Sequence, residues 1–382
     1  MNQPFTAATP PMGWNSWNTF YDQIDESLVM TMADAICDQG LKDLGYEYVI
    51  IDDCWQQKTR NTRGELVADP VKFPHGMRYL ADYIHERGLK FGIYSSCGTK
   101  TCANYPASFE HEFQDAKTFA EWGVDYLKYD NGHRPMSLRT PELFRRMGMA
   151  LKNSGRDILF AACQWGQDDV HRWIRSAGAH TFRSTVDITD SWESIRSIAW
   201  KQLENQGFNG PYCFSDMDML VVGMSGNSVN PEANQGGCSN REYLTHFALW
   251  CMFSSPLIIG CDIRNMSEEA KEILSNKNLI AINQDPEARG CYKIEAFQNP
   301  DAFILIRPLS DGDYAIGFFN FSDKKTDITL EFWDMGLSVH AGVALELRDC
   351  VTEEIIENLT ETYTCSVDAH GCKVYRCRLV ER

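Results

Sequence analysis

The stretch Asp125-Tyr126-Leu127-Lys128-Tyr129-Asp130-Asn131-Gly132 reads as a buried strand that carries charged side chains into a site. Tyrosine and leucine favour extended backbone, and the helix-like segment before it ends at Trp122-Gly123, where glycine is a common helix terminator. Side chains alternate along a strand, so Lys128 and Asp130 project from the same face. The plainest alternative to a catalytic role is a buried ion pair between these two residues that only holds the structure together.

The same unit recurs along the chain between about residues 10 and 260: a helical segment, often a glycine, a short apolar strand and a polar cluster. A period of roughly 35 residues with alternating helices and strands predicts right-handed βαβ units and a parallel sheet. Eight strands are expected, at residues 11–15, 48–53, 89–95, 125–130, 158–165, 180–185, 212–215 and 256–260.

Eight such units predict an α/β fold, a TIM (β/α)8 barrel, with a doubly wound open sheet as the alternative. No G-x-G-x-x-G follows any of the strands, which removes the usual reason to prefer the open sheet. A helix at residues 267–275 and the apolar segment 279–286 complete this part, so a catalytic barrel is expected over residues 1–288.

The pattern changes after Cys291, where short alternating runs are separated by turn residues. Residues 289–382 are therefore expected to form an antiparallel β-sandwich domain of about 90 residues. It contains no chemical cluster, so its expected role is to stabilise the barrel or to mediate association, including a possible homo-oligomer. Its strands are expected at residues 303–307, 314–319, 343–347, 354–357, 362–367 and 373–379.

Composition excludes several classes of protein. Hydrophobic residues make up 43% of the 382 residues, and no apolar run approaches the roughly 18 residues that a membrane span needs. The net charge of −17 disfavours nucleic acid and anionic membranes as partners, because both would repel the chain. A neutral ligand such as a sugar is compatible with this charge.

The N-terminal residues and the cysteines indicate in which cellular compartment the protein is expected. Residues 1–8 lack the basic and apolar regions of a signal peptide, although a chain whose signal had been removed would look the same. Most of the 14 cysteines lie within apolar patterns and read as small buried hydrophobes. Cys97 and Cys102 have no matching pair at zinc spacing, so neither a metal nor another cofactor is expected.

Polar and aromatic residues collect where the expected strands end, which is where barrel enzymes hold their catalytic groups. Several acids at one mouth would repel one another unless some pair with Lys128 and Arg183, so this crowding indicates a catalytic carboxylate site. The residues at the strand ends are Trp14, Trp17, Asp52, Asp53, Tyr94, Lys128, Asp130, Gln164, Trp165, Arg183, Asp187, Asp216 and Asp218.

Two chemistries fit such a site. Divalent-metal enzymes also gather acids at barrel ends, but they usually prefer His or clustered Glu ligands and rarely place several tryptophans beside them. Trp14, Trp17, Trp55 and Trp165 instead suggest flat apolar platforms for a pyranose, although each of them taken singly is more often a core residue. A nucleophile and an acid/base acting on a glycosidic bond fit best.

Several motifs occur in one order along nearly the whole chain. They are Met12-Gly13-Trp14-Asn15-Ser16-Trp17, Ile51-Asp52-Asp53-Cys54-Trp55, Gly98-Thr99-Lys100-Thr101-Cys102, Tyr126-Leu127-Lys128-Tyr129-Asp130-Asn131, Asp216-Met217-Asp218-Met219-Leu220 and Ala281-Ile282-Asn283-Gln284-Asp285-Pro286. With these motifs the chain resembles glycoside hydrolase family 27, which contains the α-galactosidases and the α-N-acetylgalactosaminidases.

The resemblance implies a retaining double displacement in which Asp130 is the nucleophile and Asp187 the acid/base. Lys128 is expected to keep the nucleophile ionised, whereas an acid needs a raised pKa to hold its proton near neutrality. Asp52 and Asp53 match the pair that binds the hydroxyls at C4 and C6 of galactose. The other residues expected to bind substrate are Trp17, Tyr94, Cys102, Lys128, Gln164, Trp165, Arg183 and Asp218.

The chain departs from the secreted relatives at its cysteines. Those relatives pair the cysteine of the T-K-T-C motif with one just after the nucleophile, but Gly132 stands at that place here, so Cys102 has no partner. Cys54 and Cys163 likewise lack the partners that the resemblance would lead one to expect. These losses predict a reducing, cytoplasmic location.

Specificity at C2 of the sugar depends on the segment Cys163-Gln164-Trp165-Gly166-Gln167 in this family. The resemblance implies that bulky residues there exclude an acetamide, and Gln164 is large and can still bond a hydroxyl, so galactose is favoured. The alternatives are an α-N-acetylgalactosaminidase or a β-L-arabinopyranosidase on the same scaffold, or a sugar-binding barrel without catalysis. The expected substrate is a small molecule or oligosaccharide with terminal α-galactose.

Overall fold

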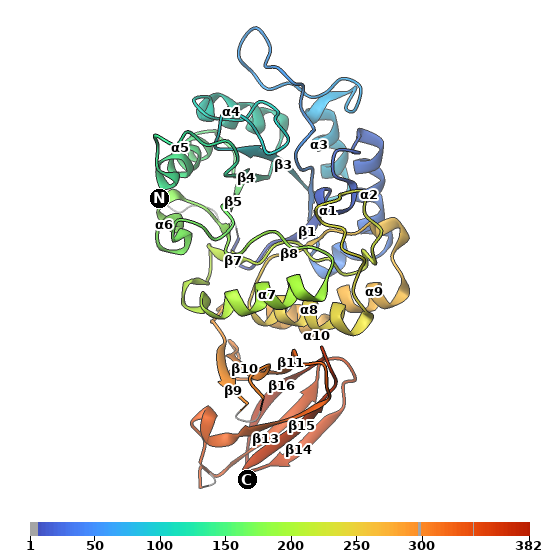
Figure 1. Cartoon of the computed structure of the whole chain (residues 1–382), viewed down its shortest axis with the longest axis vertical. Helices are drawn as coiled ribbons and strands as arrows, with labels where there is room; N and C mark the ends of the chain where they lie inside the picture. Colours follow the sequence, from blue (N-terminus) through green and yellow to red (C-terminus); the bar gives the residue numbers. More distant parts are fainter. Residues whose placement is uncertain (1–6, 297–298, 339) are drawn as a thin grey trace.

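The computed structural model describes residues 7–296, 299–338 and 340–382. Met1–Thr6 lie outside the described residues, and with them most of the segment inspected for a signal peptide. Figure 1 shows two parts: a ring of helices around a central set of strands, and below it a domain built mainly of strands, in orange and red.

The central strands form the predicted TIM barrel, and all eight predicted strands are present. The sheet order is β7-β6-β5-β4-β3-β2-β1-β8, each adjacent pair in this order is parallel, and β1 pairs with both β2 and β8. Consecutive order excludes the doubly wound alternative, in which the order reverses at a switch point. The strands are β1 Met12–Asn15, β2 Tyr48–Ile50, β3 Lys90–Ser96, β4 Tyr126–Asp130, β5 Leu159–Cys163, β6 Thr181–Arg183, β7 Phe214–Asp216 and β8 Leu257–Ile259.

The barrel closes between β7 and β8 beyond the end of β7. Within the described residues the link is a single bridge between Leu220 and Ile259. Its two backbone bonds run from the Leu220 N–H to the Ile258 carbonyl at 2.7 Å, and from the Gly260 N–H to the Leu220 carbonyl at 2.9 Å. This seam is much shorter than the paired length of β3 and β4 on the opposite side.

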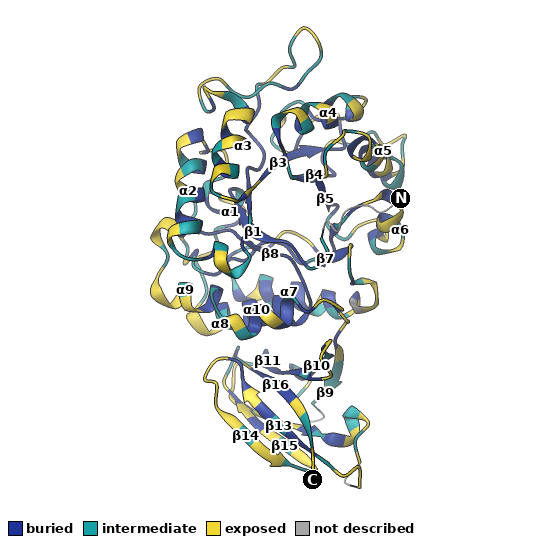
Figure 2. Ribbon diagram, turned by 180° about the vertical axis from the view of Figure 1, so that it is seen from behind, coloured by how far each residue is buried: buried dark blue, intermediate teal, exposed yellow. Residues whose placement is uncertain are grey.

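Helices cover the outside of the barrel, and Figure 2 shows that their outward faces are exposed while the strands are buried. The helix expected at residues 267–275 is confirmed as α9, and Ser267 caps its start. The helices are α1 Trp17–Phe20, α2 Glu26–Asp38, α3 Gly76–Glu86, α4 Glu112–Trp122, α5 Thr140–Lys152, α6 Val170–Ala177, α7 Trp192–Leu203, α8 Asn240–Met252, α9 Glu268–Leu274 and α10 Lys277–Asn283.

The C-terminal part is an antiparallel β-structure with its own core, as predicted. Six strands form one sheet in the order β14-β13-β16-β11-β10-β9, and β12 and β15 form a second. Side chains such as Ile304, Phe318, Ile328 and Leu345 fill the space between the sheets. The strands are β9 Tyr292–Glu295, β10 Ala302–Pro308, β11 Tyr314–Asn320, β12 Thr326–Glu331, β13 Val343–Asp349, β14 Ile355–Leu359, β15 Thr362–Val367 and β16 Cys372–Glu381.

Two of these strands were not predicted. β9 has no fully buried residue, so its sequence carries a weak apolar signal. β12 buries only Ile328 and Leu330, which is too short an alternation to separate from a turn.

The sandwich packs against α7 and α8 of the barrel, which explains why α8 is buried over most of its length. Arg307 of β10 is fully buried and donates to the carbonyl oxygen of Cys251 at 3.2 Å. His370 contacts the Glu242 carboxylate at 2.7 Å and stacks on Trp192 at 4.6 Å. In the described part of the chain, no helix combines the length and the apolar character that crossing a membrane requires.

Candidate active site

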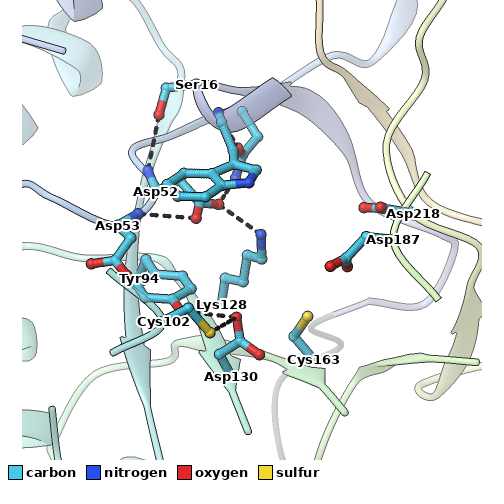
Figure 3. A network of polar contacts seen from close by, with 12 residues as sticks. Ser16, Asp52, Asp53, Tyr94, Cys102, Lys128, Asp130, Cys163, Asp187 and Asp218 are labelled. Atoms are coloured by element: carbon cyan, nitrogen blue, oxygen red, sulfur yellow. Dashed lines mark hydrogen bonds and ion pairs between the residues drawn. The ribbon is translucent and has the colours of Figure 1, made fainter. Parts of the chain in front are cut away.

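A cavity of about 110 Å³ lies at the carboxyl ends of the barrel strands. Most of the predicted site residues line it, although they come from strands that are far apart in the sequence (Figure 3). The predicted residues that line the cavity are Trp17, Asp52, Tyr94, Cys102, Lys128, Asp130, Trp165, Arg183, Asp187 and Asp218.

Asp130 ends β4 at the deep end of the cavity, and only 6% of it is exposed. The Tyr94 hydroxyl donates to its Oδ2 at 2.8 Å, and the backbone N–H of Asn131 donates to its Oδ1 at 2.8 Å. The Cys102 thiol is a more distant donor, at 3.7 Å from Oδ2. Burial raises the pKa of Asp130 to about 6, against the opposing attraction of Lys128.

Lys128 does not pair with Asp130, so the simple buried pair between these two residues is excluded. The Lys128 Nζ lies 2.7 Å from Oδ2 of Asp52, on the other side of the cavity (Figure 3). Burial is the largest single influence and works against the charge on Lys128, but the attraction of Asp52, together with Cys163, Asp130 and Asp218, outweighs it, and the pKa of Lys128 is well above its usual value. The expected effect of Lys128 on Asp130 is therefore present but is smaller than the effect of burial.

Asp52 is held as firmly as its lysine partner. The side-chain amide of Asn15 donates to its Oδ2 at 2.8 Å, and the backbone N–H of Asp53 donates to its Oδ1 at 2.9 Å. Both oxygens of this buried carboxylate thus have donors, and the ion pair with Lys128 leaves a fixed charged wall inside the cavity.

Arg183 holds two further acids at the other side of the cavity. Its guanidinium donates to Asp187 at 2.8 Å and lies 3.1 Å from Asp218, and only 3% of the arginine side chain is exposed. Asp218 also accepts the backbone N–H of Ile188 at 2.8 Å, so it fixes the segment that carries Asp187. Asp187 lines the cavity but is open to solvent, with 71% of its side chain exposed. The predicted neutralisation of the acids by Lys128 and Arg183 is confirmed.

Only two of the four tryptophans named as sugar platforms reach the cavity. Trp17 lines it and packs on Tyr21 with ring centroids 4.7 Å apart, and Trp165 lines it from the loop after β5. Trp14 and Trp55 are fully buried, and their indole N–H groups donate to the carbonyl oxygens of Cys261 and Tyr94. The interpretation of these two as platforms is wrong, because they belong to the packed layer under the helices.

Asp53 and Gln164 do not line the cavity. Asp53 is buried, and it accepts the backbone N–H groups of Ala103 at 2.9 Å and Cys54 at 2.7 Å, so it organises the neighbouring loop. Gln164 is also buried, with its amide 3.4 Å from Asp168, whereas Cys163 beside it lines the cavity. Contact of Asp53 and Gln164 with a sugar stays a prediction.

Some residues that line the cavity do not lie at a strand end and belong to none of the motifs described above. Asn230, Glu232 and Ala233 lie in the long connection at residues 217–239 between β7 and α8, far from any strand end. Long connections in compact domains are often functional, and that length is the one feature that could have drawn attention to them. The further lining residues not predicted as site residues are Asn18, Cys163, Ile188, Thr189 and Met219.

Thirteen of the 14 cysteines, all except Cys291, have free thiols. A Cβ atom at Gly132 would lie 2.7 Å from the Sγ of Cys102, so the thiol fills the space where a side chain of residue 132 would stand. Among the described residues, no group of three or more His, Cys, Asp or Glu side chains is arranged to hold a metal ion.

Two family models match the chain. The model described as alpha galactosidase A matches residues 9–285, and the model of the alpha galactosidase C-terminal beta sandwich domain matches residues 300–377.

Relatives and solved structures agree with these matches. An α-galactosidase of Cyamopsis tetragonoloba is 40% identical over 368 residues, which cover 96% of this chain and 85% of the relative. Alpha-galactosidase 3 of Arabidopsis thaliana is 41% identical over 371 residues, with 97% and 82% covered. The crystal structure of α-galactosidase I from Mortierella vinacea has a TM-score of 0.90 at 34% identity, and covers 98% of both chains. A Saccharomyces cerevisiae α-galactosidase with raffinose has a TM-score of 0.87 at 29% identity, also with 98% of both chains covered.

Proposed function

The chain belongs to the α-galactosidase family, glycoside hydrolase family 27, and we propose that it hydrolyses terminal α-D-galactosyl residues of small molecules or oligosaccharides. The observation that carries the proposal is the pair of carboxylates on one cavity in opposite surroundings. Asp130 is buried and held by two donors, and Asp187 is exposed and held by Arg183. Two carboxyl groups with different environments are the arrangement that divides nucleophile from acid/base in glycosidases.

In the proposed reaction, Asp130 attacks the anomeric carbon while Asp187 protonates the leaving oxygen, and Asp187 then activates the water that releases the sugar. The Tyr94 hydroxyl and the Asn131 N–H orient the Asp130 carboxylate, and both bonds favour its ionised form. A pKa of about 6 leaves most of Asp130 ionised at neutral pH. The net stereochemical outcome is retention.

The charged wall formed by Asp52 and Lys128 is suited to bind a ring with several hydroxyl groups at the deep end of the cavity. A carboxylate and an ammonium fixed 2.7 Å apart can together accept from and donate to neighbouring hydroxyls. Trp17 and Trp165 offer apolar surface in the same cavity. Charged groups that recognise hydroxyls, with aromatic surface beside them, fit a pyranose better than an apolar ligand.

Aryl glycosides of galactose, N-acetylgalactosamine and β-L-arabinopyranose, assayed side by side, test the proposal. We expect kcat/KM for the α-galactoside to exceed that for the α-N-acetylgalactosaminide by at least about 10-fold, as one steric clash or lost hydrogen bond allows. A higher kcat/KM for the α-N-acetylgalactosaminide would make N-acetylgalactosamine the preferred sugar. If the protein hydrolyses none of the three glycosides, the proposal that it is a glycosidase is wrong.

We also propose that the protein works in a reducing compartment such as the cytoplasm. Support comes from the free thiols of Cys54, Cys102 and Cys163 and from Gly132 at the place where secreted relatives hold the partner of Cys102. Thiol titration of the denatured, unreduced protein is expected to find nearly all cysteines free. Three or more disulfides would contradict this location.

A further inference from the structure

One acid on the cavity has no part in the proposed reaction. Glu232 lines the cavity and is exposed, and in the described part of the chain its carboxylate has no hydrogen-bond or ion-pair partner. It lies in a segment that we call the rim loop, residues 226–237, between β7 and α8. An unpaired carboxylate facing a ligand cavity is free to accept hydrogen bonds from what enters it.

The rim loop is fixed on one side to α1. The Ser228 hydroxyl donates to the carbonyl oxygen of Asn18 at 2.5 Å, and the Val229 N–H donates to that of Thr19 at 3.0 Å. The Asn230 amide reaches the carbonyl oxygen of Trp17 at 3.3 Å. These bonds place Glu232 beside the aromatic wall of the cavity.

The other side of the rim loop is fixed to the segment that carries Asp187. Asp190, three residues further on, donates its N–H to the carbonyl oxygen of Ala233 at 2.8 Å. Its carboxylate accepts the Gly226 N–H at 2.9 Å, and its carbonyl oxygen accepts the Gly237 N–H at 3.1 Å. Glu232 is therefore held between α1 and the Asp187 segment by bonds that its own side chain does not make.

The Glu232 carboxylate lies close enough to Tyr21 to act on its hydroxyl. Burial, and after it the negative charge of Glu232, raise the pKa of the Tyr21 hydroxyl. Tyr21 packs on Trp17, which lines the cavity. Glu232 thus stands at the open end, near Trp17 and Tyr21, whereas Asp130 and Asp52 are buried.

The position has a chemical consequence that rests on the proposed function. Asp187 is exposed at the open end and protonates the oxygen between galactose and the leaving group, so the leaving group lies at that end. We propose that Glu232 is a specificity-determining residue that accepts hydrogen bonds from hydroxyls of the leaving group. The inferred substrates are α-galactosides whose leaving group is a second sugar, in preference to those with an apolar leaving group.

The test compares two substrates in three variants. The ratio of kcat/KM for an α-galactosyl disaccharide to kcat/KM for a phenyl α-galactoside is measured in wild type, Glu232→Ala and Glu232→Gln. We expect Glu232→Ala to lower this ratio about 10-fold, the loss typical of a hydrogen bond to a charged acceptor. Glu232→Gln keeps an acceptor oxygen and should lower the ratio less. Glu86→Ala removes an exposed acid on α3 that does not line the cavity, and should leave the ratio unchanged.

The outcomes separate this inference from the proposed function. An unchanged or increased ratio in Glu232→Ala, with both substrates hydrolysed by the wild type, would overturn the role of Glu232 and leave the α-galactosidase proposal intact. A wild-type protein that hydrolyses neither substrate would overturn the proposed function, and with it this inference. Thermal unfolding of the variants checks folding, which should be preserved because the rim loop is held by other groups.

Discussion

The deep end and the open end of one cavity hold the same residue types in opposite surroundings. At the deep end Asp52 and Asp130 are buried, and their oxygens are bonded to Lys128, Asn15, Tyr94 and backbone N–H groups. At the open end Asp187 and Glu232 are exposed, and the Glu232 carboxylate has no hydrogen-bond or ion-pair partner among the described residues.

This difference teaches what each end can do. Charges at the deep end are desolvated and cannot change partners without a large penalty, so they define one binding geometry before a ligand arrives. The acids at the open end are solvated, so a ligand completes their surroundings. The sugar that is retained should therefore be recognised strictly, and the leaving group more tolerantly.

Asp130→Asn is expected to have the largest effect. Removing the nucleophile should lower turnover about 10⁴-fold or more for disaccharide and aryl substrates alike, since both pass through the same covalent step. Galactose binding, measured by calorimetry, should stay detectable because Asp52 and Lys128 remain. An unchanged turnover would dismiss Asp130 as the nucleophile.

Lys128→Met tests whether the deep end is held by its buried ion pair. The substitution leaves the Asp52 carboxylate buried without its cation, which should lower the free energy of unfolding by about 3–5 kcal/mol in urea titrations. Asp52→Asn added to Lys128→Met should recover part of that loss. The half-exposed pair of Lys90 and Glu47 provides the control, and Lys90→Met should cost less than about 1 kcal/mol. If Lys128→Met and Lys90→Met lower the free energy of unfolding equally, the buried ion pair contributes no more than the exposed one, and the comparison of the two ends fails.

Asp187→Ala tests the open end, where a substitution should lower kcat strongly but change the free energy of unfolding little. Loss of a general acid should lower kcat for the disaccharide about 10²- to 10³-fold, and less for an aryl galactoside whose leaving group needs little protonation. The free energy of unfolding should change by less than about 1 kcal/mol, because the carboxylate is exposed and Arg183 keeps Asp218. If kcat falls by a similar factor for both substrates, Asp187 is not the acid/base.

The smallest expected effect is on the pH dependence of stability. The pKa of Asp130 is raised to about 6, so between pH 4 and 6 the folded protein keeps a proton that the unfolded chain releases. Its contribution to stability therefore falls as the pH rises through this window. Asp130→Asn removes this dependence, and its free energy of unfolding relative to wild type should rise by about 2 kcal/mol from pH 4 to pH 7 in urea titrations. A constant difference would contradict the raised pKa.

Much of the deep end was predictable because its residues lie at or just after strand ends. The repeated unit located β2, β3, β4 and β5, and the alternation of side chains placed Lys128 and Asp130 on one face of β4. Sequence could not choose the partner of Lys128. The long side chain reaches past β3 to Asp52, and such a contact depends on the curvature of the closed barrel.

The errors follow from the same physical reasons. Trp14 is next to Asn15 on β1, so the two side chains point to opposite faces, and only Asn15 faces the Asp52 carboxylate inside the barrel. Glu232 was missed because no periodic pattern marks a loop, and its place depends on hydrogen bonds to α1 and to Asp190. Strand ends can be read from a sequence, whereas the path of a long connection cannot.

The short seam between β7 and β8 makes the barrel uneven in local stability. Few backbone bonds join these two strands, so this joint should open more often than the others, and its amide protons should lose protection first. Asp218 lies in the segment that supplies Leu220 to the seam, so each opening would also release Arg183 from one of its acids. On heating, activity should therefore be lost through opening of this seam at a lower temperature than that at which the whole chain unfolds.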